Sequence, residues 1–398
     1  MRILVLSTHD NRGGAAKAAY RFSKEFEKQG HDVCMYVRDK SLEDDFIVQS
    51  PKRNLFAKVS HFLDFTPGYI LNGFDKGVQF TLGLFGENLK QAIKEFKPDV
   101  INIHWTWKGF VSFPKICKIS KKIPVVYTMH DYSPFLGGIT YPDQGEGLLV
   151  NTLSKLNQSL RKIFLKDSNI TFVSPSEFLL EEFKKSTMPT NLKKKVINNG
   201  VEKHMFREQD KNIIRGKLNL QPNKKYILLG AVNLLNNPVK GGKILGEILH
   251  EMEEYLIKEE IGLVAFGSQN PFEQLKLDKG IEKKFLGFIK TEEGMARVLS
   301  SVNVMLVPSL AENYPFVVLE PLSCKTPVVA FSIGGIPEMI IHKGNGYLAK
   351  VGDKDNFIDG IKFCLEGKMN ESKRDYSIET KAREYLKLFN NSRKTSLS

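Results

Sequence analysis

The segment RILVLSTHDNRGGAAKAAYRFSKEFEKQGHDVCMYVR, residues 2–38, decides the expected fold. Its two ends, residues 2–7 and 32–38, are short and almost wholly apolar, whereas residues 13–30 between them have the pattern of a helix. Short strands that are apolar along their whole length belong to parallel sheets covered on both faces, and a helix is the usual connection between parallel strands. The segment therefore predicts one strand–helix–strand unit of a doubly wound α/β sheet.

The same alternation continues along the chain in two series. Further apolar runs lie at residues 99–104, 123–130 and 170–176, and then at residues 225–232, 261–268, 283–289, 302–309 and 327–332. The polar segment 209–225 separates the two series and has the composition of a connection between domains. We expect two Rossmann-like domains that face a cleft, residues 1–203 and residues 204–376. The last helix, in residues 377–398, could pack on either domain, and we assign it to the first.

The composition excludes several classes of protein. A chain of 398 residues that is 41% hydrophobic and 26% charged is large enough for two globular domains and is not of disordered composition. Residues 3–6 are too short an apolar run for a signal peptide, and no run approaches the roughly 20 residues that cross a bilayer. The four cysteines fit neither a disulfide framework nor a zinc site, which favours a reducing cytoplasm.

The net charge of +13 is concentrated in the first half of the chain. Residues 1–203 contain 30 Lys and Arg against 21 Asp and Glu. A basic half of this kind suits nucleic acid, an anionic membrane or a phosphorylated substrate, and it is equally compatible with an ordinary soluble surface. Charge alone does not choose among these partners.

Two glutamates follow one of the later strands, in AENYPFVVLEPL (311–322). Pro315 suits the first position of a helix, so Glu312 is expected in a loop and Glu320 inside the helix. In one continuous helix, eight residues would separate the carboxylates by ~12 Å and ~80° of rotation. Carboxylates that share acid–base work in glycosidases stand roughly 5–9.5 Å apart. The pair better suits the two ends of one elongated ligand, with a diphosphate between them at the helix N-terminus.

The run VPSLAENYPFVVLEPLSCKTPVVAFSIGGIPEMI, residues 307–340, resembles the signature of the family 4 retaining glycosyltransferases, which have the GT-B fold. Their E-x7-E motif matches Glu312 and Glu320, and their G-G-I-P-E motif matches residues 334–338. The resemblance extends to Gly13-Gly14, His130-Asp131, N-G-V at 199–201 and Lys240-Gly241. INIHW (101–105) together with TMHDYSPFLGG (128–138) is most similar to members that build bacterial surface polysaccharides.

The resemblance implies a reaction in which a sugar moves from a nucleotide diphosphate to an acceptor hydroxyl with retention of configuration, and for which neither a metal nor another cofactor is needed. Glu320 would bind the ribose hydroxyls, and Glu312 would lie at the donor sugar near the reacting centre. His130 would reach the donor sugar and the phosphates. Further donor contacts are implied at Ser309, Asn313, Tyr314, Pro315 and Phe316.

The lysine of the K-G motif departs from the family pattern. Lys240 would neutralise the diphosphate, but the arginine that usually precedes this lysine is missing from residues 230–242. Either Lys240 works alone, or Lys243 or an arginine from elsewhere assists it.

The first domain would supply the acceptor side of the cleft. Gly13 and Gly14 open a helix directly after the first strand and would present free amides there. They lack the G-x-G-x-x-G spacing of a dinucleotide-binding dehydrogenase. His104, Trp105 and Asp131 are candidates for the same side, although His104 and Trp105 could equally be core residues.

We therefore expect a cytoplasmic enzyme that uses a nucleotide sugar and a saccharide acceptor, preferably lipid-linked, in the synthesis of O-antigen, capsule or exopolysaccharide, without nucleic acid as a partner. Residues 50–74 interleave Lys52, Arg53 and Lys58 with Phe56, Phe62, Phe65 and Tyr69. This segment is either an element that lies on the inner membrane surface or a helical insertion packed on the first domain. The alternative functions are a nucleotide-sugar epimerase of similar fold and a nonenzymatic protein that binds sugar nucleotides or nucleic acid.

Overall fold

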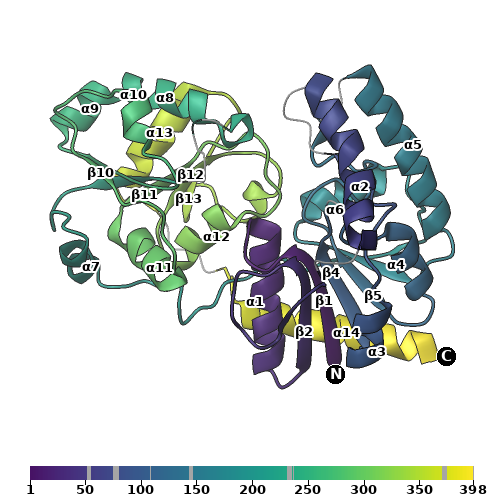
Figure 1. Cartoon of the computed structure of the whole chain (residues 1–398). Helices are drawn as coiled ribbons and strands as arrows, with labels where there is room; N and C mark the ends of the chain where they lie inside the picture. The colour runs from purple at the N-terminus through teal and green to yellow at the C-terminus, as the bar shows by residue number, and fades with distance from the viewer. Residues whose placement is uncertain are drawn as a thin grey trace. The chain divides into compact units, whose positions relative to one another are not determined.

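The computed structural model describes residues 1–397 except 52–54, 75–79, 108, 143–146, 231–234, 236 and 370–373. The chain forms two compact units, each coloured along the sequence in Figure 1. Unit 1 comprises Met1–Asn199 with Ile378–Ser398, and unit 2 comprises Gly200–Ser377. The chain therefore leaves unit 1 shortly before the expected boundary at residue 203, and its last helix lies in unit 1.

Unit 1 is built on a seven-stranded sheet in the order β3-β2-β1-β4-β5-β6-β7, in which all neighbouring strands are parallel. Its strands are β1 (Arg2–His9), β2 (Asp32–Asp39), β3 (Ile47–Gln49), β4 (Val100–Trp105), β5 (Val125–Thr128), β6 (Ile170–Ser174) and β7 (Lys193–Val196). The chain order reverses between β1 and β4, which is the place where sheets of this kind usually bind ligands. The loops at the carboxyl ends of β1, β4 and β5 therefore meet at one edge.

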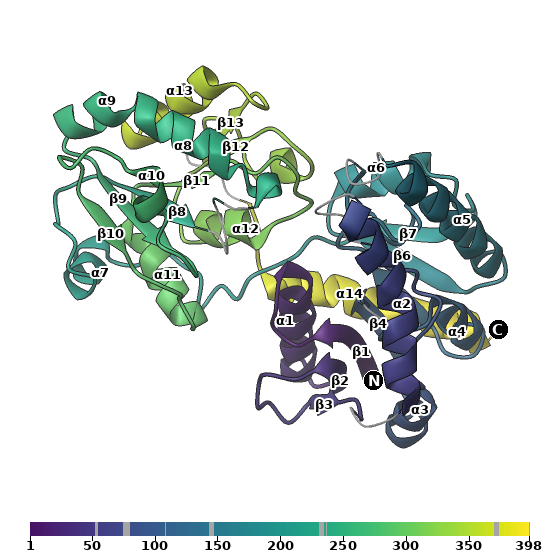
Figure 2. The same cartoon turned by 45° about the horizontal axis from the view of Figure 1, so that its top comes forward.

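Helices cover both faces of this sheet (Figures 1 and 2). They are α1 (Gly14–Lys28), α2 (Leu55–Phe74), α3 (Lys90–Phe96), α4 (Phe113–Ile119), α5 (Leu148–Leu165), α6 (Glu177–Lys185) and α14 (Ile378–Leu397). On one face, Phe22 and Phe26 of α1 pack against Tyr385 and Phe389 of α14, with ring centroids 4.7–6.1 Å apart. The aromatic contacts fix the C-terminal helix to the first strand–helix unit, although the two are far apart in sequence.

Unit 2 has a six-stranded parallel sheet in the order β10-β9-β8-β11-β12-β13. The strands are β8 (Tyr226–Gly230), β9 (Gly262–Phe266), β10 (Lys283–Phe285), β11 (Val304–Val307), β12 (Val328–Phe331) and β13 (Gly346–Ala349). Its helices are α7 (Lys211–Lys217), α8 (Gly242–Glu251), α9 (Glu253–Lys258), α10 (Pro271–Leu275), α11 (Glu292–Ser301), α12 (Phe316–Ser323) and α13 (Lys354–Leu365), with 3-10 turns η2 (Pro238–Lys240) and η3 (Ile336–Glu338). The switch in strand order falls between β8 and β11.

The predicted fold class of two Rossmann-like α/β domains is confirmed. The central strands are buried on both faces, because every residue of β8, β11 and β12 is buried. Polar side chains cap several helices: Ser176, Asp210, Thr291 and Asp353 each accept a hydrogen bond from a backbone amide in the first turn that follows. The four cysteines are buried free thiols, in agreement with the absence of a disulfide framework in the sequence.

Helix α2 carries the segment that the sequence left open between two readings. The side chain of Asp64 is fully buried and accepts hydrogen bonds from the amides of Gly83 and Gly109, so this helix is attached to unit 1. Its outer surface nevertheless exposes Phe62 and Tyr69, whose exposed fractions are 64% and 68%. Lys52 and Arg53 lie outside the described residues, as do the side chains of Phe56 and Phe65. The helix is thus both packed on unit 1 and apolar on its outer surface.

Candidate functional site

The loop that follows β11 carries the first glutamate of the pair, and the next helix carries the second. Glu312 lies between the end of β11 at Val307 and the start of α12 at Phe316, and Glu320 lies within α12. The expected loop and helix positions are therefore confirmed, except that Pro315 caps the helix instead of occupying its first turn. Glu320 is only 5% exposed, so it is not a solvated carboxylate on the helix surface.

Lys240 and Glu312 form an ion pair at this edge of the unit 2 sheet. The Nζ atom of Lys240 lies 2.5 Å from Oε1 of Glu312, and the glutamate side chain is only 8% exposed. Lys240 ends the turn η2, which follows β8, so the two residues come from the two strands that flank the switch point. The Lys240 side chain is 29% exposed, so removing it would leave the buried Glu312 carboxylate without its compensating charge. A bound anion would compete with the carboxylate for the ammonium group.

Two glycines hold the loops around this pair. Gly241 has φ +69°, and a Cβ atom there would lie 1.9 Å from the carbonyl oxygen of Pro308. Gly334, the first glycine of the G-G-I-P-E motif, has φ +57°, and a Cβ atom there would lie 1.8 Å from the carbonyl oxygen of Glu312. In addition, the amide of Leu310 donates to the carbonyl oxygen of Val239 over 2.8 Å. The backbone around Lys240 and Glu312 is therefore fixed from both sides by contacts that only glycine permits.

The other residues expected to contact the donor are mostly enclosed. Ser309, Tyr314 and Phe316 are 2%, 8% and 8% exposed, and burial raises the pKa of Tyr314. Their side chains anchor the loop and the start of α12. The first backbone amides of a helix lack intrahelical acceptors and favour anions. This segment can therefore bind an anionic ligand through main-chain N–H groups between Asn313 and Phe316.

In unit 1, a chain of hydrogen bonds runs from His130 into the core. His130 Nε2 lies 3.0 Å from His104 Nδ1, and His104 Nε2 lies 2.9 Å from Asn102 Oδ1. The Asn102 amide nitrogen lies 3.2 Å from Thr128 Oγ1, which in turn lies 2.9 Å from the hydroxyl of Tyr385 on α14. His104 is 1% exposed, which agrees with the core position that the sequence left open beside a place on the acceptor side. It lies beneath His130 because β4 and β5 are adjacent in the sheet.

This series of hydrogen bonds determines the tautomers of His104 and His130. The amide nitrogen of Asn102 donates to the carbonyl oxygen of Val126, so its carbonyl oxygen accepts from His104 Nε2. Burial lowers the pKa of His104 well below its ordinary value and that of His130 to about 3, so both rings are neutral. His104 then accepts at Nδ1 the proton that His130 carries on Nε2. The lone pair of His130 is therefore on Nδ1.

The remaining candidates lie at the carboxyl edge of the unit 1 sheet. Gly13 caps α1 with φ +90°, and a Cβ atom added at Gly13 or Gly14 would meet nothing within 4 Å, so this helix start has open space beside it. Trp105 stacks on the buried Trp107 with ring centroids 5.7 Å apart. Asp131 accepts from the amide of Ser133 over 2.8 Å, and burial raises its pKa. Its carboxylate holds the turn that follows His130.

Helix α5 holds this turn from behind, which the sequence did not lead us to expect. Ser154, Asn157, Gln158 and Arg161 donate to the carbonyl oxygens of Leu136, Gly137, Phe135 and Ser133, respectively. These four polar residues are spaced three, one and three positions apart, so they share one helical face. The sequence does contain a signal for this role: four polar residues lie on one face of a helix that otherwise contains leucines. That pattern could have indicated a helix face that binds a neighbouring turn.

Among the described residues, no three His, Cys, Asp or Glu side chains lie together in a way that could hold a metal ion. The described part of the chain also contains no helix with the length and apolar character of a membrane span. Neither finding tests the expectation of a metal-independent enzyme, which stays a prediction.

Family comparisons agree with this division into two units. Residues 12–204 match the model described as Glycosyltransferase Family 4, and residues 210–384 match that of Glycosyl transferases group 1. The chain is a glycosyltransferase. The first match contains Gly13, His104 and His130, and the second contains Lys240, Glu312 and Glu320.

Two distant relatives of this glycosyltransferase match most of its length. An uncharacterised glycosyltransferase of Methanocaldococcus jannaschii is 26% identical over 74% of this chain and 75% of its own. The D-inositol 3-phosphate glycosyltransferase of Mycobacteroides abscessus is 25% identical over 90% of this chain and 81% of its own. The structure of Anabaena HepE in complex with UDP and glucose covers 98% of this chain and 100% of its own, with a TM-score of 0.64 at 17% identity. The predicted GT-B fold is thereby confirmed.

Proposed function

We propose that this glycosyltransferase is a retaining, metal-independent member of family 4 that moves a sugar from a nucleotide diphosphate to a hydroxyl of a saccharide acceptor. The Lys240–Glu312 pair carries the proposal, because it places a cation and a carboxylate at the switch point of the unit 2 sheet beside the N-terminus of α12. The fold shared with HepE, whose structure contains UDP and glucose, supports a nucleotide-sugar donor. The chemistry of the candidate side chains at this site supports the roles given below.

In the proposed reaction, the bond between the anomeric carbon and the diphosphate oxygen breaks, and its electron pair leaves with the phosphate. Lys240 stabilises the charge that develops there, together with the first amides of α12. The acceptor oxygen forms a new bond on the same face, and its proton passes to the departing phosphate oxygen. The products are a glycoside of unchanged configuration and a nucleoside diphosphate.

The two glutamates have different tasks in this proposal. Glu320 accepts hydrogen bonds from the ribose hydroxyls, which do not change during the reaction, and Glu312 contacts the donor sugar. A bound diphosphate is a second anion that competes for the Lys240 ammonium group. Its binding therefore also frees the Glu312 carboxylate from the ion pair, so that the carboxylate can accept hydrogen bonds from the sugar hydroxyls. His130 is neutral and accepts a hydrogen bond at Nδ1 from a sugar hydroxyl; it does not act as a cation for the phosphates.

We further propose that the acceptor is lipid-linked, and that the enzyme works on the cytoplasmic face of the inner membrane in the synthesis of surface polysaccharide. Two surface helices of unit 1 support this proposal. Helix α2 exposes Phe62 and Tyr69, and helix α5 exposes Leu156 and Ile163 next to Lys162. Apolar side chains beside lysines suit an anionic lipid surface. Sedimentation with vesicles of phosphatidylglycerol tests it: Phe62→Ser should release the protein, whereas Phe288→Ser, at a similarly exposed site in unit 2, should not.

Release of nucleoside diphosphate from a panel of UDP-, GDP- and ADP-sugars tests the proposed transfer. Release should require both one particular donor and a saccharide acceptor. An epimerase would convert the donor sugar without an acceptor, and a binding protein would release nothing. Either result would refute the proposal.

A further inference from the structure

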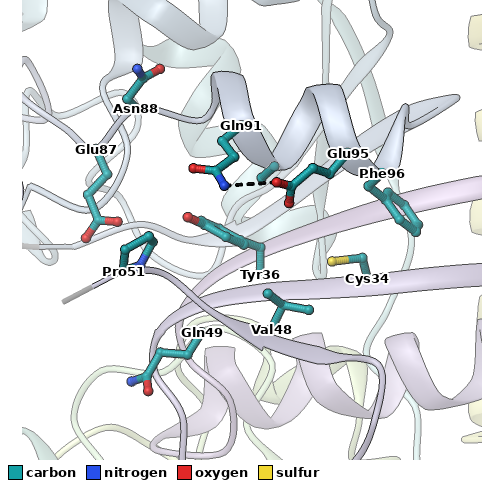
Figure 3. A pocket seen from close by; sticks show the side chains of 11 residues that line it. Cys34, Tyr36, Val48, Gln49, Pro51, Glu87, Asn88, Gln91, Glu95 and Phe96 are labelled. Atoms are coloured by element: carbon teal, nitrogen blue, oxygen red, sulfur yellow. Dashed lines mark hydrogen bonds between the residues drawn. The ribbon is translucent and has the colours of Figure 1, made fainter. Parts of the chain in front are cut away.

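A cavity of about 500 Å³ lies in unit 1 beside the edge strand β3, between β2, β3 and helix α3. Figure 3 shows its lining side chains, among them Tyr36, Gln49, Glu87, Gln91 and Glu95. The volume is in the range of small-molecule sites. None of the residues discussed above as donor or acceptor contacts lines it.

Tyr36 brings a hydrogen-bonding group to the wall of this cavity. The residue as a whole is 6% exposed, and among the residues that the structure describes its hydroxyl has no hydrogen-bond partner, although this oxygen is open to the cavity and to solvent. Figure 3 shows this hydroxyl directed into the space bordered by Gln91 and Pro51. A phenol hydroxyl at such a wall can both donate a hydrogen bond to a ligand and accept one from it. The ring itself is held by stacking on Phe110, with centroids 6.1 Å apart.

The charges that line the cavity limit what it can take. Glu87 and Glu95 are both in the lining, and the described part of the chain contributes no lysine or arginine to it. Glu87 is 9% exposed, and burial raises its pKa, although the neighbouring Ser50 hydroxyl and Arg38 partly oppose this. A phosphate or an acidic sugar would meet two carboxylates in this cavity and is excluded, in a protein that is otherwise strongly basic. Neutral or amino-bearing ligands are favoured.

The remaining groups suit a ligand with many hydroxyls. The side chains of Gln49 and Gln91 offer both donors and acceptors, and the carboxylates accept from hydroxyl groups. The faces of Tyr36 and Phe96 supply apolar surface of the kind on which the C–H face of a sugar ring packs. Gln91 is held by its hydrogen bond to Glu95 over 2.9 Å, drawn as a dashed line in Figure 3.

The cavity lies near the edge of the sheet where the acceptor is expected. Arg38 and Asp39, at the carboxyl end of β2, are near enough to Glu87 to affect its pKa. His9, at the carboxyl end of β1, lies 3.3 Å from Asp39. In a parallel sheet, these ends lie at the same edge as those of β4 and β5, which carry Trp105 and lead to His130.

We infer that the cavity bordered by Tyr36, Gln91 and Glu87 is a subsite for a neutral or amino sugar. This inference rests on the proposed function, in which that sugar is a unit of the acceptor other than the one that receives the transferred sugar. The Tyr36 hydroxyl and the two carboxylates bind its hydroxyl groups, and the negative charge of the carboxylates disfavours acidic sugars.

Saturation-transfer difference NMR of the full chain, without any nucleotide sugar, tests the subsite. The probes are N-acetylglucosamine, glucosamine and glucuronic acid at millimolar concentration. We expect signals from the first two and none from glucuronic acid. Tyr36→Phe should weaken binding about fivefold, as loss of one hydrogen bond does, whereas the matched Tyr69→Phe on α2 should change nothing. No signal from any probe, an equal signal from glucuronic acid, or an unaffected Tyr36→Phe would overturn the inference.

Glu87→Gln separates a binding role from a structural one. Removing a desolvated carboxylate should leave the melting temperature unchanged or raise it, while sugar binding falls at least fivefold. A lowered melting temperature with unchanged binding would instead mean that Glu87 is structural, and the subsite would be refuted. Glu254→Gln, an exposed position in unit 2, is the control.

A thermal-shift measurement with nucleotide sugars distinguishes a failure of the subsite proposal from a failure of the proposed transfer reaction. A donor that still raises the melting temperature when no probe sugar binds the cavity refutes only the subsite. In the complete reaction, Tyr36→Phe should raise the KM for the acceptor about fivefold without changing the KM for the donor.

Discussion

Gly334 lies directly against the carbonyl group of Glu312, so close that a Cβ atom at this glycine would stand 1.8 Å from the oxygen. Through this contact, the glycine in the loop after β12 fixes the backbone of the glutamate in the loop after β11. The backbone of Glu312 is pressed between this loop and the turn that carries Lys240. The orientation of the ion pair therefore depends on a residue that carries no side chain.

Gly334→Ala should destabilise unit 2 and reduce transfer. The substitution combines a left-handed backbone with a clash against main-chain atoms, which costs at least about 2 kcal/mol. Gly352→Ala is the matched control, since Gly352 has φ +75° but a Cβ atom there would meet nothing within 4 Å. Urea unfolding of both variants measures the difference. Equal losses of stability would show that the contact with Glu312 has no energetic importance.

Lys240→Ala should lower kcat by roughly a hundredfold or more, because the departing diphosphate loses several kcal/mol of stabilisation. Lys240→Arg should recover only part of the activity, since a planar guanidinium does not replace a compact ammonium in this turn. Lys258→Ala, at an exposed position on α9, controls for loss of surface charge. If Lys240→Ala keeps nearly normal turnover, another cation holds the phosphate. Lys243→Ala and the double variant would then identify it.

Glu320→Ala and Glu312→Ala should have different kinetic effects. Loss of a ribose contact weakens donor binding in the ground state and the transition state alike, so Glu320→Ala should raise the KM for the donor. Glu312→Ala should lower kcat at saturating donor without weakening donor binding, because it leaves the whole charge of Lys240 to the diphosphate. Steady-state kinetics with varied donor measure both. Purely KM-type effects of similar size from the two variants would contradict these roles.

The pair formed by the buried His104 and the partly exposed His130 should make unit 1 sensitive to acid. The unfolded chain takes up a proton on His130 near pH 6.5, whereas the folded chain does not do so until about pH 3. Stability should therefore fall as the pH falls from about 6.5 towards 4, by up to about 1.4 kcal/mol per pH unit for each such histidine. Burial raises the pKa of Asp131, so this carboxyl group makes the folded state more stable as the pH falls. Comparison of wild type with a His130 variant separates the two contributions.

His130→Gln should make the free energy of unfolding less dependent on pH, by the equivalent of about one proton taken up on unfolding. His61→Gln, at an exposed position on α2, should leave this dependence unchanged. Urea unfolding between pH 4 and 7 gives both slopes. A slope that is identical in wild type and His130→Gln would show that this histidine is protonated in the folded enzyme, and the tautomers assigned above would be wrong.

Much of the fold could be predicted because buried parallel strands are apolar along their whole length. The helix that carries Glu320 could be predicted from Pro315 and the apolar run after it. Strand β7 could not, because its sequence KKKV has three lysines. It lies at the edge of its sheet, where lysines protect an open strand from pairing with other chains.

The contacts of the candidate site were less accessible from the sequence. Lys240 and Glu312 are 72 positions apart, and Thr128 and Tyr385 are 257 positions apart. Spacing along a single element reveals neighbours on one helix or strand, but such pairs meet only after the sheet forms. For the same reason the sequence left His104 open between the acceptor side and the core, whereas the order of β4 and β5 buries it beneath His130.

The configuration of the first product shows whether this enzyme is a retaining glycosyltransferase. Proton NMR of the reaction with the preferred nucleotide sugar and a saccharide acceptor follows the anomeric signal of the new glycoside as it appears. We expect this signal to have the configuration of the donor, to grow in step with the nucleoside diphosphate, and to be almost absent with Lys240→Ala. A product of inverted configuration, or a donor sugar that changes in the absence of any acceptor, would contradict this expectation.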